Sequence, residues 1–223
     1  MDEVTKKWRK FLLEGKEVPY QIYCDMDGVL VDLEEGVIEA LGMEDIEEET
    51  RAAAIQVVRS GEVWQGFKDE KQFPELSKGV KEIFKTISKN SNFWANLPLK
   101  DDAQQLLSYI ASMNPTQYIL SAPWDEASRK GKILWLSHMA ENLKPVPKKD
   151  KIILTHDKHL YAVNPVTGEP NILIDDMRKY LDPWRKALKK AGHSTEYAIE
   201  HISTERTINK LEELLGIKKL KTI

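Results

Sequence analysis

Short apolar segments that end in polar or charged residues alternate along this chain with longer segments whose apolar residues recur at helical spacing. The short segments are rich in β-branched and aromatic residues, which favour a pleated and packed surface. We expect strands at 20–24, 117–120, 151–155 and 171–174, and a weaker one at 197–199. Helical spacing returns between them, for example over 103–113 and 204–215. This alternation predicts an α/β fold with a Rossmann-like parallel sheet flanked by helices.

One long stretch interrupts the alternation. No strand signal rises between residues 33 and 97, where the apolar spacing is helical and the acidic run 44–49 is typical of a solvated helix face. We therefore expect a small all-helical cap, residues 33–97, inserted after the first strand. The α/β core would then consist of residues 1–32 and 98–223. Within it, residues 1–19 are expected to form a short amphipathic helix with no apolar signal-peptide core.

The composition narrows the class of protein. A chain of 223 residues with 41% hydrophobic and 31% charged residues fits a soluble core with a modest cap. Its apolar runs fall short of the roughly 20 residues that a membrane span needs, so no membrane partner is expected. The single cysteine, Cys24, excludes an internal disulfide and fits a reducing cytoplasm, which is the expected location. A net charge of −3 gives no general attraction to nucleic acid.

Polar side chains follow four of the predicted strands. Asp25 and Asp27 follow the first, Ser121 the second, Lys158 the third, and Asp175–Asp176 the fourth. The carboxyl ends of parallel strands meet at one edge of a sheet, where ligands bind. Carboxylates held close together repel each other, which is costly without a cation or a shared proton, and Mg²⁺ prefers such oxygen ligands. A hydroxyl and a lysine beside them suit phosphoryl transfer, in which positioning and charge neutralisation do most of the work.

Each of these features also has an explanation without chemistry. Two Asp residues after a strand occur as a metal-binding pair in glycosyltransferases, or simply in a turn. Ser121 fits a turn, Lys158 and Lys132 fit a solvated surface, and Asp175–Asp176 fit the start of a helix. The order of these residues on successive strand ends favours an enzyme.

The segment Asp25-Met26-Asp27-Gly28-Val29-Leu30 resembles the first motif of the haloacid dehalogenase superfamily of phosphotransferases. The resemblance implies that Asp25 is the nucleophile forming an aspartyl-phosphate and Asp27 the general acid and base. Ser121 matches the hydroxyl of the second motif and Lys158 the lysine of the third, with Lys132 as a second candidate for that lysine. Asp175 and Asp176 match the fourth motif. Asp25, Asp27, Asp175 and Asp176 are the implied Mg²⁺ ligands, and Asp176 is preferred to Asp175 as a direct ligand.

Three further segments resemble the 5′(3′)-deoxyribonucleotidase branch of this superfamily: 93–98, 152–158 and 172–176. Two positions depart from it, because Ala122 stands where a second hydroxyl is common and His193 where a second glycine is common. The resemblance implies a small-molecule phosphate ester as substrate, with (deoxy)nucleoside monophosphates preferred. Aromatic residues of the cap are candidates for the surface that stacks on the base, although they also fit a cap core: Trp64, Phe67, Phe93 and Trp94.

Two other functions stay open from the sequence. The same fold serves polynucleotide end phosphatases and sugar phosphatases, and a broad basic groove would favour the former. A non-catalytic phosphate-binding module is the other alternative, although the intact Asp25, Asp27 and Asp175–Asp176 argue against it.

Overall fold

Five parallel strands form the centre of the fold in this computed structural model, which describes residues 20–40, 42, 85–113, 117–139, 145 and 148–216. The strand order is β3-β2-β1-β4-β5, so the first strand of the chain lies in the middle of the sheet. Their bounds are Ile22–Cys24 (β1), Gln117–Ser121 (β2), Ile152–Leu154 (β3), Ile172–Asp175 (β4) and Ala198–Glu200 (β5). Every residue of β1 and β4 is buried, as expected for parallel strands covered on both faces.

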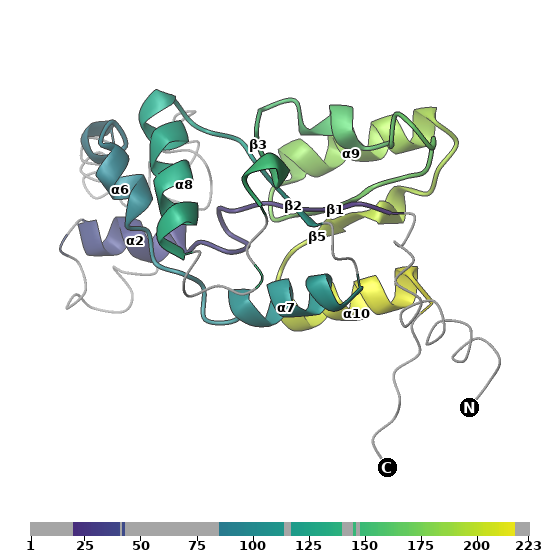
Figure 1. The fold of residues 1–223 in the computed structure, drawn as a ribbon, viewed down its shortest axis with the longest axis horizontal. Helices are drawn as coiled ribbons and strands as arrows, with labels where there is room; N and C mark the ends of the chain where they lie inside the picture. The colour runs from purple at the N-terminus through teal and green to yellow at the C-terminus, as the bar shows by residue number, and fades with distance from the viewer. Residues whose placement is uncertain are drawn as a thin grey trace, which may run out of the picture. The chain divides into compact units, whose positions relative to one another are not determined.

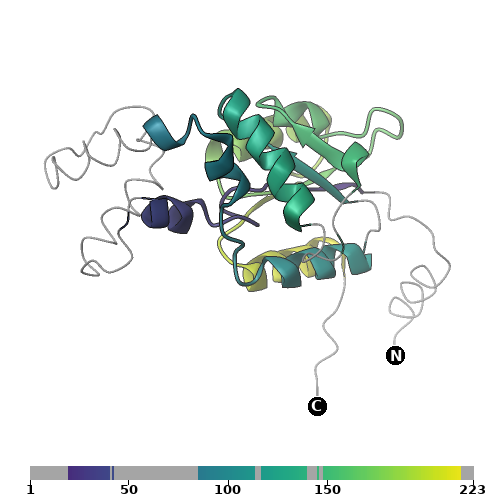
Figure 2. The same ribbon diagram turned by 60° about the vertical axis from the view of Figure 1, so that its left-hand side comes forward.

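Helices cover the two faces of this sheet (Figures 1 and 2). Helix α9 (Arg178–Lys190) lies on one face, while α7 (Ala103–Met113) and α10 (Thr204–Leu214) lie side by side on the other. Among the described residues, the connections between strands also contain the 3₁₀ helices η1 (Lys149–Lys151), η2 (Lys158–Tyr161) and η3 (Thr195–Tyr197).

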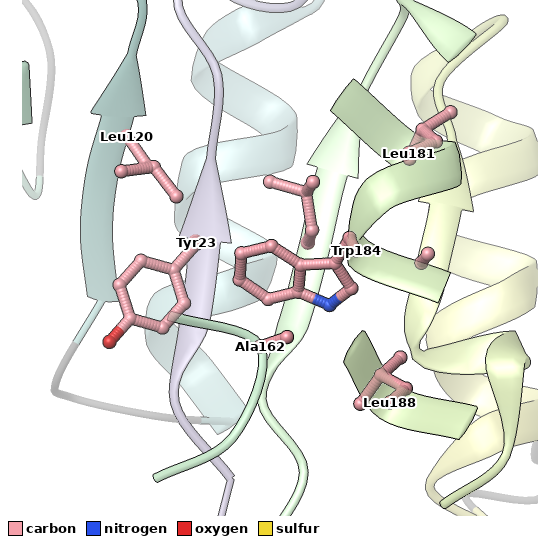
Figure 3. Close-up of a cluster of buried hydrophobic side chains, with 8 residues drawn as sticks. Tyr23, Leu120, Ala162, Leu181, Trp184 and Leu188 are labelled. Carbon is pink, nitrogen blue, oxygen red and sulfur yellow. The ribbon is translucent and has the colours of Figure 1, made fainter. Parts of the chain in front are cut away.

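The buried cluster under α9 fixes that helix on the sheet (Figure 3). Trp184 is fully buried, and its ring lies edge-on to that of Tyr23, with the ring centroids 5.7 Å apart. Leu181 and Leu188, one turn before and after Trp184, bury their side chains in the same cluster. The apolar stripe of α9 therefore holds the first turn of the helix just beyond the carboxyl end of β4.

The chain divides into two compact units: residues 1–30, 101–122 and 143–223 in the first, and 31–100 and 123–142 in the second. The second unit contains α2 (Leu33–Ala40), α6 (Ser91–Ala95) and α8 (Glu126–Met139). Helix α8 packs closely on α6, because a Cβ at Gly131 would lie only 2.6 Å from the backbone oxygen of Ser91. The indole N–H of Trp135 in α8 donates to the Leu97 carbonyl at 2.7 Å.

The predicted fold class is confirmed: the sheet is parallel and helices flank it. The helix predicted over 103–113 has these bounds in the structure. The predicted helix in residues 1–19 and the acidic run 44–49 lie outside the described residues, as does most of the predicted cap, so the domain boundaries stay a prediction. In the part of the chain that the structure describes, no helix is long and apolar enough to cross a membrane.

Candidate active site

Asp25, the residue directly after β1, stands opposite Asp175, the last residue of the neighbouring strand β4. β1 pairs with β4 in the register Cys24↔Ile174, and the Asp25 N–H continues the ladder by donating to the Ile174 carbonyl at 2.9 Å. Asp25 is 4% exposed and Asp175 is fully buried. The parallel register thus forces two buried carboxylates together at the carboxyl edge of the sheet.

Lys158 joins these two carboxylates. It is the first residue of η2, and its side chain is completely buried. Its Nζ lies 3.0 Å from Asp25 Oδ1 and 2.6 Å from Asp175 Oδ2. Backbone N–H groups complete the arrangement, because Met26 donates to Asp25 Oδ1 at 2.7 Å and Met177 donates to Asp175 Oδ1 at 2.9 Å.

The charges of this cluster are not balanced within it. Burial by itself would lower the pKa of Lys158, but Asp25 and Asp175 outweigh it and raise that pKa, so the lysine is held in its charged form. Burial, followed by the charge of Asp25, raises the pKa of Asp175 to about 7 despite the opposing effect of Lys158. One ammonium therefore does not compensate the carboxylates that surround it.

Asp176 adds a further carboxylate beside the turn that follows β1. Gly28 in that turn has a φ of +73°, and a Cβ at this position would overlap the Asp176 carboxylate. The residue as a whole is exposed, but its carboxylate is packed against Gly28 and the acidic cluster. Loss of solvent around the carboxylate, then the charges of Asp25, Asp175 and Asp27, raise the pKa of Asp176 to about 8.

Asp25, Asp175 and Asp176 form a group that fits a metal ion. One carboxylate oxygen from each lies within 4.8 Å of the other two. Hard divalent cations take oxygen ligands of this kind, and Mg²⁺ usually combines a few carboxylates with water. The raised pKa values of Asp175 and Asp176 show an excess of negative charge that a cation would relieve. The donor set therefore fits a divalent cation.

Ser121 ends β2 with a buried hydroxyl. The pairing Cys24↔Ile119 places Ser121 just beyond the level of Asp25 on the neighbouring strand. The residue is fully buried, and its Oγ has no hydrogen-bond partner among the described residues. An unsatisfied buried hydroxyl costs about 1–3 kcal/mol, so a ligand oxygen that bonded to it would recover that cost.

Two other predicted residues are not members of this group of three carboxylates. Asp27 is half-buried in the turn after β1 and is not one of the three clustered carboxylates, although its charge contributes to the raised pKa of Asp176. Lys132 lies in α8, in the second unit, where it is 1% exposed and its Nζ is 5.7 Å from the centroid of the Trp94 ring. The catalytic role of Asp27 and the phosphate-binding role of Lys132 stay predictions.

The four candidate aromatics differ in what the structure says of them. Trp64 and Phe67 lie outside the described residues. Trp94 is 2% exposed, and its indole N–H donates to the Ser88 carbonyl at 2.7 Å, so it belongs to the core of the second unit. Phe93 is half-buried and lies edge-on to Trp94, with the ring centroids 5.2 Å apart.

Sequence reasoning missed Tyr180. The centroid of its ring lies 4.3 Å from Lys158 Nζ. Its position four residues after Asp176, on the helix that follows the fourth predicted strand, was the available signal. One helical turn places such a residue near the site, but it does not tell which way the ring faces.

Comparison with known proteins decides the family. The family model described as 5′ nucleotidase, deoxy (pyrimidine), cytosolic type C protein matches residues 19–214. The chain belongs to this family. It is therefore a hydrolase related to the haloacid dehalogenase-like phosphatases, and the resemblance stated from its motifs is confirmed. No curated protein matches this sequence.

Several solved structures resemble this chain at low identity. A hydrolase from Streptococcus pneumoniae TIGR4 is 13% identical, with a TM-score of 0.47 over 89% of this chain and 98% of its own. A haloacid dehalogenase-like hydrolase from Bacteroides fragilis is 18% identical, with a TM-score of 0.43 over 85% and 92%. One from Burkholderia xenovorans LB400 is 13% identical, with a TM-score of 0.44 over 78% and 82%. Family membership rests on the match over residues 19–214.

Proposed function

We propose that this protein is a Mg²⁺-dependent phosphatase that hydrolyses 5′(3′)-(deoxy)nucleoside monophosphates through an aspartyl-phosphate on Asp25. The observation that carries the proposal is the ion-paired group Asp25–Lys158–Asp175 at the carboxyl edge of the sheet, in a chain of the nucleotidase family. With a divalent cation bound to offset the excess negative charge, a buried lysine and an unpaired buried hydroxyl at the neighbouring strand end would suit a phosphoryl group better than a neutral ligand.

Asp25 is the proposed nucleophile because its contacts leave one oxygen for attack. Among the described residues, the Met26 N–H and Lys158 both bind Oδ1. The other oxygen attacks phosphorus, the ester P–O bond breaks, and the leaving oxygen takes a proton from Asp27. Water then gives a proton to Asp27 and attacks phosphorus, which breaks the bond to Asp25 and releases inorganic phosphate.

Asp25, Asp175 and Asp176 are the residues that would hold Mg²⁺, with Asp27 as the further ligand implied by the first motif. When bound, the ion supplies positive charge that offsets the charge of the phosphoryl oxygens. Lys158 contributes positive charge next to Asp25, because Asp25 and Asp175 raise its pKa despite the opposing effect of burial.

Phosphate binding is proposed for Ser121, Lys158 and Lys132. Support is clearest for Ser121, whose buried Oγ lacks a partner among the described residues and lies at a strand end next to that of Asp25. Its O–H can donate to a phosphoryl oxygen, which would satisfy the hydroxyl and orient the group.

A nucleoside monophosphate is the proposed substrate because the matching family is one of deoxynucleotidases, and the cytoplasm is the proposed location because the family is described as cytosolic. Half-buried Phe93 is the described aromatic candidate for contact with the base, and Trp64 and Phe67 remain candidates from the sequence.

The test is release of inorganic phosphate from a substrate panel, with Mg²⁺ and with EDTA. The panel holds 5′- and 3′-nucleoside monophosphates in ribo and deoxy forms, sugar phosphates, 5′- and 3′-phosphorylated oligonucleotides and p-nitrophenyl phosphate, with Asp25→Asn as the control. The proposal expects Mg²⁺-dependent turnover that is fastest on nucleoside monophosphates. Faster turnover of oligonucleotides or sugar phosphates would contradict the proposed substrate class. No turnover of any member of the panel would contradict the proposed phosphatase activity.

A further inference from the structure

We propose that Tyr180 is a positioning residue: its ring covers the Lys158 ammonium and holds it between Asp25 and Asp175, so that Asp25 keeps one orientation during phosphoryl transfer. The inference rests on the proposed function of Asp25 and extends it to a residue in the first turn of α9 that none of the sequence motifs includes.

The contact between the Tyr180 ring and Lys158 is short, and it involves a buried charge. Lys158 Nζ is 4.3 Å from the centroid of the Tyr180 ring, within the distance at which an ammonium is attracted by an aromatic face. The Lys158 side chain is completely buried, so water does not screen this attraction as it would at the surface. Burial, together with the charges of Asp25 and Asp175, raises the pKa of Tyr180 to about 12, although Lys158 acts in the opposite direction. The tyrosine therefore stays neutral.

A lysine at this position needs such a restraint. Its four-carbon stem is flexible, and its ammonium carries three donors that rotate together. Asp25 Oδ1 and Asp175 Oδ2 fix the ammonium from two directions, at 3.0 Å and 2.6 Å. The Tyr180 ring limits the position of the ammonium from a third direction, and thereby favours a location from which the ammonium contacts both carboxylates.

This restraint matters because Lys158 binds the same oxygen of Asp25 as the Met26 N–H does. From its present position the ammonium can donate its third N–H to an incoming phosphate ester, but an ammonium free to move fully toward this competing anion would release Asp25 Oδ1. Displacement of reacting groups by about 1 Å can cost on the order of a hundredfold in rate. Tyr180 would thus act on the rate through Lys158, without touching the substrate.

Tyr180 has a second cation near its ring that provides a matched control. Lys179 Nζ lies 4.9 Å from the same ring centroid, but Lys179 is exposed, and the ammonium that pairs with Asp25 and Asp175 is that of Lys158. If the ring works through the buried lysine alone, Lys179→Met should leave turnover as it is.

The kinetic experiment compares Tyr180→Leu, Tyr180→Phe and Lys179→Met on p-nitrophenyl phosphate, with melting temperatures measured alongside. Tyr180→Leu is expected to lower kcat about tenfold with KM within about twofold, as suits a shielded cation–π contact that acts in the transition state. Tyr180→Phe keeps the aromatic face and should restore most of kcat. Three results would overturn the proposal: an unchanged kcat in Tyr180→Leu, an equal loss in Tyr180→Phe, or a raised KM with unchanged kcat.

A spectroscopic measurement separates this proposal from the proposed function. Protons over an aromatic face are shifted upfield, so the ε-methylene and ammonium resonances of Lys158 should move downfield in Tyr180→Leu and stay near their wild-type positions in Tyr180→Phe. This readout needs no turnover, so it tests the contact even if the substrate panel shows no phosphatase activity. Lys158 resonances that are the same in wild type and Tyr180→Leu would contradict the contact, whereas an inactive wild type with the expected shifts would contradict only the proposed function.

Discussion

The Asp176 carboxylate occupies the space that a side chain at Gly28 would need, so the two cannot be present together. The turn after β1 therefore sets the position of a carboxylate that the chain supplies after β4. This relationship joins two motifs almost 150 residues apart in sequence, and it makes Gly28 part of the acidic cluster although it has no ligand atom of its own.

Gly28→Ala should weaken Mg²⁺ binding, measured by isothermal titration calorimetry, and lower the melting temperature. The alanine must adopt a φ of +73°, which costs roughly 1–2 kcal/mol, and it must also displace the Asp176 carboxylate. Gly168→Ala is the matched control, because Gly168 has a φ of +76° and nothing within 4 Å of the added Cβ. Equal Mg²⁺ affinities in the two variants would show that Gly28 does not position Asp176 for the ion.

The metal-free protein should lose stability as the pH rises from about 4 to about 8. The pKa of Asp175 is raised to about 7 and that of Asp176 to about 8, whereas both lie near 3.9 in an unfolded chain. The folded state therefore binds more protons in this range, and the free energy of unfolding falls with pH until both groups are ionised.

Urea unfolding at several pH values in EDTA measures this slope. Asp176→Asn removes one of the two groups and should flatten the slope, and excess Mg²⁺ should restore stability at the upper end of the range by binding the folded state. A slope that is the same in wild type and Asp176→Asn would mean that the Asp176 carboxyl group ionises in the folded protein as it does in the unfolded chain.

Ser121→Ala should raise KM for p-nitrophenyl phosphate about tenfold, the usual value of one hydrogen bond to a charged group, without lowering the melting temperature. The mutation removes a buried hydroxyl that has no partner among the described residues. Ser128→Ala is the control for stability, because the buried Ser128 Oγ accepts the Trp124 N–H at 2.7 Å, and its loss should lower the melting temperature. A stability loss in Ser121→Ala with unchanged KM would make Ser121 a structural residue.

The alternation of strands and helices, and with it the parallel sheet, could be predicted because it follows from the local sequence pattern. Buried strands such as Ile172–Asp175 are continuous apolar runs, and the carboxyl ends of parallel strands meet at one edge whatever the side chains are. That rule was enough to expect Asp25 and Asp175 together, and the β1–β4 register does place them opposite each other.

The partners of Lys158 were beyond the reach of the sequence. Whether a lysine after a strand faces solvent, phosphate or carboxylate depends on the path of the chain after β3. Here η2 turns the side chain inward, onto Asp25 and Asp175 and under the ring of Tyr180. Similarly, the spacing of Phe93 and Trp94 does not tell which of two adjacent aromatics is buried, since that depends on the packing of α6 against α8.

Trp94→Ala and Phe93→Ala should therefore behave differently. Trp94 is 2% exposed and its indole N–H is hydrogen-bonded, so its removal should cost about 3–5 kcal/mol of stability and impair all substrates alike. Phe93 is half-buried, and if it stacks on the base, its loss should raise KM for nucleoside monophosphates by a factor that corresponds to about 1–3 kcal/mol, with p-nitrophenyl phosphate nearly unaffected. Equal changes in KM on both substrates for Phe93→Ala would exclude a role in base recognition.

Acid-quenched peptide mass spectrometry of the Asp27→Asn variant, mixed with p-nitrophenyl phosphate and Mg²⁺, tests most directly whether Asp25 accepts the phosphoryl group. Asp25 stays able to attack an activated ester in this variant, while the base for hydrolysis is gone, so steady turnover should fall on the order of 10²–10⁴-fold and the phosphoenzyme should accumulate. The account predicts one added phosphoryl group on the peptide that contains Asp25, and none when Asp25→Asn is added to the same variant. Phosphorylation of another residue, or full turnover with an unmodified Asp25 peptide, would contradict it.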